Sequence, residues 1–299
     1  MSSGNFIDFD ACVTPCVSQF ITLRGMRLHV RVWGDDDAPL LFLLHGWQDF
    51  SGSFQFLVDA LQGSWRCIAP DWRGFGQSQW NHGGYWFPDY VADLDGLLDH
   101  YSPTEPARLI GHSMGGNVAC VFAGVRPQRV SHLVSLEGFG MPGNDPDEAP
   151  GRYTNWLDQM RKPPKARHYA DRAALAQRLR RINPRLTEPR AAFLAQHFGA
   201  EQADHIEVAS DPYHKVLTPY PYRLEEAKAC WRRVTAPVLW VEADDSTAMM
   251  MYRGLGDTDY QARWSCFQNL RRVLLANASH NMHHDQPEQL AQLIEEFMV

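Results

Sequence analysis

The sequence IGHSMGG at residues 110–116 decides the fold of this chain of 299 residues. It lies between a short apolar run at residues 107–110 and a helix-like segment at residues 117–123. A serine in a G-x-S-x-G turn between a strand and a helix has a strained backbone conformation. The flanking positions are glycines because a Cβ there would collide with the neighbouring strand or helix. The helix start also places backbone N–H groups and a positive dipole end beside the serine oxygen. We therefore expect Ser113 to be a reactive hydroxyl rather than an incidental residue of a glycine-rich turn.

The other apolar runs predict a mostly parallel sheet with helices between its strands. Residues 40–44 form a continuous apolar run, as expected of a strand buried on both faces. In residues 87–101 apolar side chains recur at spacings of three and four, which indicates an amphipathic helix. The remaining expected strands are residues 18–23, 26–33, 66–70, 107–110, 130–136, 237–241 and 272–276, and the remaining core helices are 53–61, 225–233 and 287–298.

The composition changes between residues 142 and 224, where prolines recur and no strand-like core run is found. Residues 153–161, 172–182 and 188–198 have helical character. We interpret residues 142–224 as an inserted helical cap, with residues 1–141 and 225–299 forming the two parts of the core. Residues 152–190 contain eleven Lys and Arg but only three acidic residues. This surplus fits a solvated helical face or, alternatively, an electrostatic funnel for anionic substrates.

Charge and hydropathy restrict the possible partners. The formal net charge of -7 argues against nucleic acid as a partner. No apolar run is long enough to span a membrane, and the N-terminus lacks the pattern of a signal peptide. The six cysteines are scattered without zinc spacing, and Cys12 and Cys16 have no second pair to complete a site. The sequence therefore predicts free thiols, no metal and a cytoplasmic location.

Two motifs resemble those of the α/β-hydrolase superfamily, and the resemblance extends over nearly the whole chain. One is HGWQD at residues 45–49 with the later Phe54, and the other is GHSMGG at residues 111–116. Together they are similar to the serine hydrolase-like branch of esterases. The resemblance implies an α/β-hydrolase fold, with a doubly wound, mostly parallel eight-stranded sheet and an inserted helical cap. It also implies acyl-transfer chemistry without a cofactor.

In this family the G-x-S-x-G turn carries the nucleophile, so the resemblance assigns that role to Ser113. The histidine base follows the last strand, where His280 stands, and we rank His283 and His284 well below it. The oxyanion would be bound by the backbone N–H groups of Trp47 and Met114. The DWRGFGQS stretch at residues 71–78 is common in such proteins, and we assign it a scaffold role.

The acid of the triad has two candidates. Most relatives place an aspartate three residues beyond a glycine after the seventh strand, and that position falls on Ser246, one residue past Asp245. Some relatives instead place the acid after the sixth strand, where Glu137 stands in a turn resembling that of haloalkane dehalogenases with a glutamate acid. Either carboxylate could orient His280. We favour Glu137, and Asp245 stays the alternative.

These residues predict a carboxylesterase-like serine hydrolase that cleaves a small or medium ester, lactone or thioester through an acyl-enzyme. A carbon–carbon bond hydrolase or a perhydrolase would use the same triad. A third alternative is a ligand-binding receptor or pseudo-enzyme on the same fold. The expected partner is a small ester-like molecule held under the aromatic side chains of the cap, which are Tyr153, Trp156, Tyr169, Phe193, Tyr213, Tyr220 and Tyr222.

Overall fold

The computed structural model describes residues 13–81, 83–246 and 257–298. The predictions that concern Cys12 and the rest of residues 1–12 lie outside this part of the chain. Three of the other cysteines are buried and two are partly exposed, and all five are free thiols.

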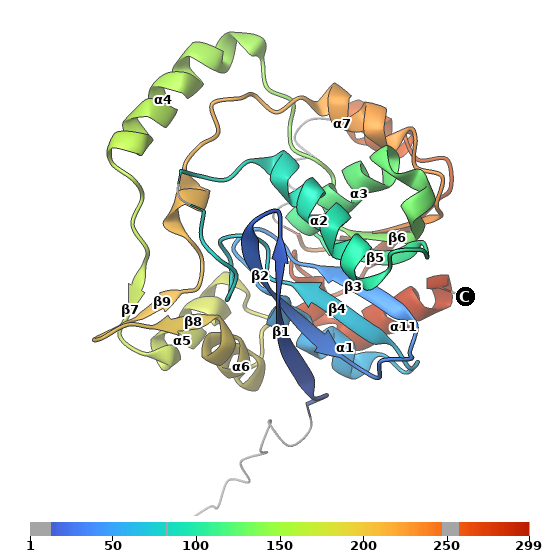
Figure 1. Cartoon of the computed structure of the whole chain (residues 1–299), viewed down its shortest axis with the longest axis horizontal. Helices are drawn as coiled ribbons and strands as arrows, with labels where there is room; N and C mark the ends of the chain where they lie inside the picture. The colour runs from blue at the N-terminus through green and yellow to red at the C-terminus, as the bar shows by residue number, and fades with distance from the viewer. Residues whose placement is uncertain (1–12, 82, 247–256, 299) are drawn as a thin grey trace, which may run out of the picture.

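The eight-stranded, mostly parallel sheet expected from the sequence is confirmed (Figure 1). Its first two strands form an antiparallel hairpin, and the second also pairs antiparallel with the strand that follows it in the sheet; the remaining pairs are parallel. In spatial order the strands are β1 (Cys16–Leu23), β2 (Met26–Trp33), β4 (Arg66–Pro70), β3 (Leu40–Leu44), β5 (Ala107–His112), β6 (Val130–Leu136), β10 (Val238–Ala243) and β11 (Leu270–Leu275).

Helices cover both faces of the sheet, and this explains the continuous apolar run of β3. Phe42 and Leu44 point into one buried cluster, whereas Leu41 and Leu43 point into the other, because successive side chains of a strand alternate between its faces. The first cluster lies under α2 (Phe87–Tyr101), α3 (Met114–Val125), α7 (Leu224–Trp231) and α9 (Asp257–Trp264). The second lies under α1 (Gln55–Ala60), α10 (Met282–Asp285) and α11 (Pro287–Met298).

The segment interpreted as a cap contains more than helices. Besides α4 (Ala149–Arg161), α5 (Arg172–Ile182) and α6 (Glu188–Phe198), it forms a three-stranded sheet in the order β7-β9-β8. These strands are β7 (His168–Tyr169), β8 (Gly199–Glu201) and β9 (Ile206–Val208). These three short strands were not predicted from the sequence. The residue boundaries of core and cap stay a prediction.

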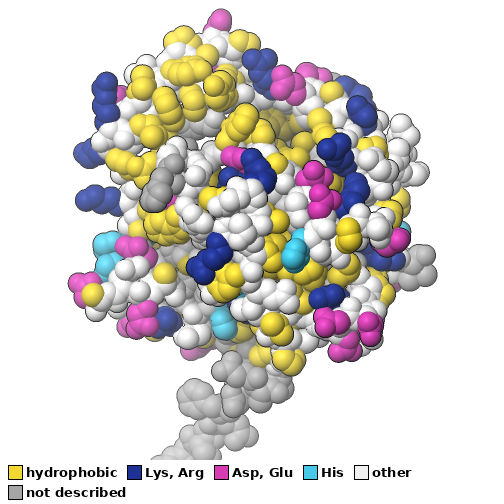
Figure 2. All heavy atoms as spheres, viewed as in Figure 1, with side chains coloured by type: hydrophobic (Ala, Val, Ile, Leu, Met, Phe, Trp, Pro, Cys, Tyr) yellow, Lys and Arg dark blue, Asp and Glu magenta, His cyan; other side chains and the backbone are white. Residues whose placement is uncertain are grey.

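Helix α4 buries none of its side chains. It forms an arch over the core in Figure 1, and Figure 2 shows hydrophobic side chains gathered over it. Tyr153 and Leu157 of α4 are 42% and 48% exposed. None of the helices in the described ranges is long and apolar enough to cross a membrane.

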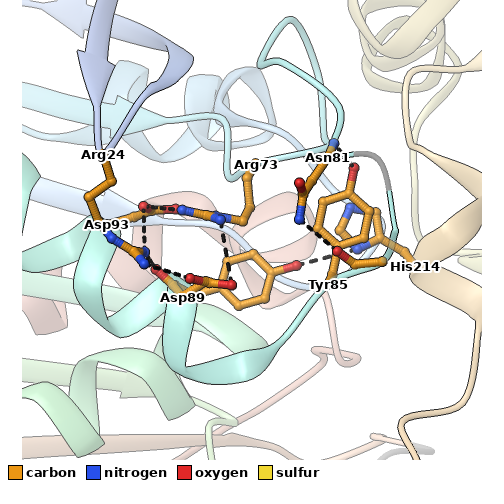
Figure 3. Close-up of polar contacts among 9 residues, drawn as sticks. Arg24, Arg73, Asn81, Tyr85, Asp89, Asp93 and His214 are labelled. Atoms are coloured by element: carbon orange, nitrogen blue, oxygen red, sulfur yellow. Dashed lines mark hydrogen bonds and ion pairs between the residues drawn. The ribbon is translucent and has the colours of Figure 1, made fainter.

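The loop after β4 fastens the cap segment to the core. Gly76 N–H donates to Ala209 O at 2.7 Å, and Asp211 N–H donates to Gly74 O at 2.8 Å. The His214 ring, from the short helix η5 (Pro212–Lys215), stacks on the Tyr85 ring with 3.6 Å between ring centroids (Figure 3). Three backbone and ring contacts thus join residues that lie more than a hundred positions apart.

Buried charged side chains anchor the same loop to the core. Nε and Nη2 of Arg73 donate to the two carboxylate oxygens of Asp93 on α2, each at 2.6 Å, and both side chains are almost fully buried (Figure 3). Asp71 Oδ2 accepts a hydrogen bond from Gln77 N–H at 2.9 Å and lies 2.8 Å from His29 Nδ1. These contacts support the scaffold role predicted for residues 71–78.

Candidate active site

Ser113 lies in the tight turn between β5 and α3. Its backbone has φ 50° and ψ −113°, a conformation that L-residues rarely adopt, and its N–H donates to Leu136 O of β6 at 2.8 Å. A Cβ added to Gly111 would lie 2.5 Å from Gly116 N, and one added to Gly115 would collide with the carbonyl of Leu44. The flanking glycines are therefore required by close approach of the backbone, as the sequence predicted.

The turn after β3 lies against the tight turn at Ser113, which we call the elbow. A Cβ added to Gly46 would be 3.3 Å from Ser113 Cβ, and Gln48 has φ 56°. Within the described part of the chain, neither Trp47 N–H nor Met114 N–H donates a hydrogen bond to another residue. Both N–H groups that we expect to form an oxyanion hole are thus available to a ligand. The Trp47 side chain is 50% exposed.

His45 holds the turn in place. Its Nε2 accepts from Trp72 N–H at 2.9 Å, so its proton resides on Nδ1, which donates to Gly46 O at 2.7 Å. Complete burial lowers the pKa of His45, which keeps the ring neutral. The neutral His45 ring therefore supports the candidate oxyanion site through its two hydrogen bonds.

Glu137 and His280 are brought together at the carboxyl ends of the strands. Glu137 Oε2 lies 2.6 Å from His280 Nδ1, and the Glu137 side chain is fully buried. Ala243 N–H donates to Glu137 Oε1 at 2.9 Å, and the Ser246 hydroxyl donates to Oε2 at 2.6 Å. Glu137 itself has φ 53°, a second strained residue at this edge of the sheet.

Asp245, the alternative acid, lies apart from this cluster. Its Oδ2 forms an ion pair with Arg185 Nη2 at 2.7 Å, and its side chain is 55% exposed. Its neighbour Asp244 accepts hydrogen bonds from Asn277 N–H and Ala278 N–H. The two aspartates therefore bind cap and loop groups in this structure, and neither contacts His280.

His112, the residue before the nucleophile, supports the loop that carries His280. Its Nε2 lies 2.8 Å from His280 O and must donate to it, and the two imidazole rings are 4.7 Å apart. Burial lowers the pKa of His112 well below its usual range, so the ring stays neutral. The elbow and the histidine loop are thus linked directly through this hydrogen bond.

His283 and His284 belong to a buried network around Ser53, and the His283 ring also packs against the ring of His112, with 4.6 Å between centroids. Both direct Nε2 toward Ser53 Oγ, at 2.8 and 3.1 Å, and Ser53 Oγ donates to Asp49 at 2.7 Å. The structure therefore places the two lower-ranked histidines beneath the site, packed against Phe54 and Phe56.

Ser113 Oγ has no hydrogen bond to His280 or to any other side chain in the described ranges. His280 lies close to His112, the residue before Ser113: its backbone oxygen accepts from His112 Nε2, and the ring centroids are 4.7 Å apart. Its side chain is 31% exposed. Catalytic hydrogen bonds in ligand-free enzymes are often long and tighten only when substrate binds.

Three contacts of the site were not anticipated: those of Ser246, His112 and His45. Ser246 was the residue found where relatives carry their aspartate, which is a signal that could have identified it as a partner of the acid. The hydrogen bonds of the His45 and His112 rings could not be predicted from a local motif.

Comparison with known proteins places the chain in a family. The family model of the alpha/beta hydrolase fold matches residues 39–287. A serine hydrolase-like protein of Danio rerio is 29% identical over 284 residues, covering 91% of this chain and 85% of the relative.

Two solved structures are similar in fold. A thioesterase domain from the curacin biosynthetic pathway has a TM-score of 0.83 at 24% identity, covering 94% of this chain and 99% of that one. An esterase of Mycobacterium tuberculosis has a TM-score of 0.70 at 17% identity, covering 95% and 91%. The strand order and the strained elbow agree with the matched family model, and the chain belongs to the α/β-hydrolase fold family.

Proposed function

We propose that this chain is a serine hydrolase that cleaves a carboxylic ester, lactone or thioester through an acyl-enzyme. The observation that supports this most strongly is the 2.6 Å contact between buried Glu137 and His280, beside the strained turn of Ser113. A buried carboxylate on Nδ1 fixes the tautomer in which Nε2 is free to accept a proton. This is the arrangement that a serine hydroxyl needs in order to attack a carbonyl.

In the proposed reaction, Ser113 Oγ attacks the substrate carbonyl carbon while His280 Nε2 takes the hydroxyl proton. Glu137 stabilises the imidazolium that forms, and the N–H groups of Trp47 and Met114 bind the oxyanion. Each of these donors would stabilise the transition state by ~3 kcal/mol. His280 then protonates the leaving alcohol or thiol, and water activated by the same histidine hydrolyses the acyl-enzyme.

The charges of the cap support a solvated basic face rather than a funnel for anions. Arg172, Arg185 and Arg190 form ion pairs with Glu201, Asp245 and Glu288, so part of the cationic surplus is neutralised. A neutral acyl substrate fits this distribution better than an anionic one.

Turnover of p-nitrophenyl esters from acetate to decanoate, measured beside acyl thioesters, tests the proposal. We expect turnover in the wild type and its loss in Ser113→Ala, with an acyl adduct on Ser113 detected by mass spectrometry. The chain-length profile would report the depth of the acyl site. Turnover that survives in Ser113→Ala would contradict a serine mechanism.

One observation favours the ligand-binding alternative, namely the missing hydrogen bond between Ser113 and His280. A receptor would bind an ester without releasing product, and its Ser113→Ala form would bind equally well. Binding of a non-hydrolysable ester analogue by both forms, without turnover of any ester by the wild type, would decide for the receptor.

A further inference from the structure

The three-stranded cap sheet brings two histidines and a glutamate together on its surface. Strand register places His168 of β7 directly across from Glu207 of β9, and His205 lies two residues before Glu207, on the same face of the chain. His168 Nε2 lies 2.9 Å from Glu207 Oε1, and His205 Nε2 lies 3.1 Å from the same oxygen. The two imidazole rings are stacked, with centroids 3.9 Å apart.

We propose that His168, His205 and Glu207 bind a divalent transition-metal ion of the type that prefers imidazole ligands, such as Zn²⁺. One ligand atom from each residue lies within 4.8 Å of the others. Tetrahedral zinc with bonds of about 2.0–2.1 Å separates its ligand atoms by roughly 3.3 Å. The two nitrogen–oxygen distances therefore need to open by only a few tenths of an ångström.

Asp204 supplies the supporting contact that such sites use. Its Oδ1 lies 2.6 Å from His205 Nδ1, so that nitrogen carries a proton and donates it. A carboxylate on the far nitrogen of a ligating histidine fixes the ring and its tautomer, and it leaves the Nε2 lone pair for the metal. Each Nε2 that now shares a proton with Glu207 would lose that proton to solvent when the ion binds, and its lone pair would then bind the metal.

The site is open to solvent on one side. The His168 side chain is 59% exposed, whereas those of His205 and Glu207 are 21% and 18% exposed. An ion can therefore enter without rearrangement of the cap, and water can fill its fourth position. The carboxylates of Asp204 and Glu207 give this surface the negative charge that favours a cation.

Bound metal would lock β7 onto β9. Only two register pairs hold these strands together, at His168↔Glu207 and Tyr169↔Ile206. Strand β9 is followed by residues 209–211, which the loop after β4 binds through backbone hydrogen bonds. The ion would therefore fasten the segment between α4 and α5 to the part of the cap that is tied to the core.

Calorimetric titration of the full chain with Zn²⁺ alone tests the site. We expect saturable binding of one ion, at least tenfold weaker in His168→Ala, His205→Ala and Glu207→Gln. Asp204→Asn should weaken binding roughly 10- to 100-fold, as loss of an outer-shell partner does. The matched control is His100→Ala on α2, an exposed histidine with no carboxylate contact among the described residues, and it should bind as the wild type does.

Hydrogen exchange with and without Zn²⁺ provides a second measurement. Slower exchange at residues 168–169 and 206–208 in the wild type, lost in His205→Ala, is the expected result. Zn²⁺ binding that is unchanged in both His168→Ala and His205→Ala would overturn the proposal, because the ion would then bind elsewhere. No saturable binding up to about 1 mM Zn²⁺ would overturn it as well.

Discussion

Glu137 and Asp245 are carboxylates with very different surroundings, and this difference yields the first prediction. Glu137→Gln should lower kcat/KM by about 10³- to 10⁴-fold, because the neutral amide no longer fixes the tautomer and charge of His280. Asp245→Asn should lower it less than tenfold, because this side chain pairs with Arg185 at the surface. Steady-state kinetics on one activated ester measures both, and the reverse ranking would make Asp245 the acid.

Ser246 gives a second prediction at the same scale. Its hydroxyl donates to Glu137 Oε2, the oxygen that also contacts His280. Ser246→Ala should lower kcat about tenfold with little change in KM, because one hydrogen bond to a charged group stabilises by about 1.5 kcal/mol. Ser246→Thr, which keeps the hydroxyl, is the matched control. Equal losses in both variants would point to a packing defect instead.

The roles predicted from the sequence depended on motif and chain order, which identified Ser113, His280 and the two candidate acids. The contact between Ser246 and Glu137 could not be predicted in this way. It depends on the register of β6 beside β10, where Leu136 pairs with Val241, and register is a property of the folded sheet.

At the scale of elements, the long periodic segments were predictable and the short ones were not. The helix expected at residues 87–101 is α2 (Phe87–Tyr101), because fifteen residues give a clear apolar period and a large buried face. Strands β7, β8 and β9 have two or three residues each, too few for an alternating pattern. They form because the ends of α5 and α6 bring these residues together.

The contact between the β4 loop and α2 gives a third prediction. Asp93→Asn should lower the free energy of unfolding by about 3 kcal/mol or more, because buried Arg73 would lose both of its 2.6 Å contacts to a carboxylate and keep only the longer one to Asp89. Asp89→Asn on the same helix is the control. Its carboxylate is 20% exposed, lies 3.5 Å from Arg73 and pairs at 2.8 Å with Arg24, whose side chain is 44% exposed, so we expect a loss within about 1 kcal/mol. Urea unfolding measures both, and equal losses would contradict the importance of the buried pair.

In the whole molecule, strain is concentrated where the candidate site forms. All five non-glycine residues with positive φ in the described ranges follow sheet strands at their carboxyl ends, and two of them, Ser113 and Glu137, belong to the candidate site. The sheet holds the turns at Ser113 and Glu137 rigidly, since its central strands β3, β5 and β6 are buried on both faces. Strained residues persist only where the surrounding structure determines them, so the core stabilises the geometry on which the proposed chemistry depends.

Buried histidines also link the stability of the whole molecule to pH, which gives the fourth prediction. Burial lowers the pKa of His214 and of His284 to about 3. In the unfolded chain these rings titrate near 6.5, so between about pH 3 and 6.5 the unfolded state binds more protons. Their contribution to stability is therefore complete above pH 6.5 and is lost as the pH falls toward 3. Each ring contributes a slope of about 1.4 kcal/mol per pH unit in that window.

His214→Phe isolates one of these contributions. The substituted ring can still stack between Phe75 and Tyr85, whose centroids lie 3.7 and 3.6 Å from that of His214. Urea unfolding at pH 6, 5 and 4 should show a slope smaller by about 1.4 kcal/mol per pH unit in His214→Phe than in the wild type. The lost contact with the Tyr90 hydroxyl, 3.3 Å away, lowers stability equally at each pH and leaves the slope unaffected. An unchanged slope would mean that His214 already binds its proton in the folded protein, and that the stack between core and cap does not exclude water.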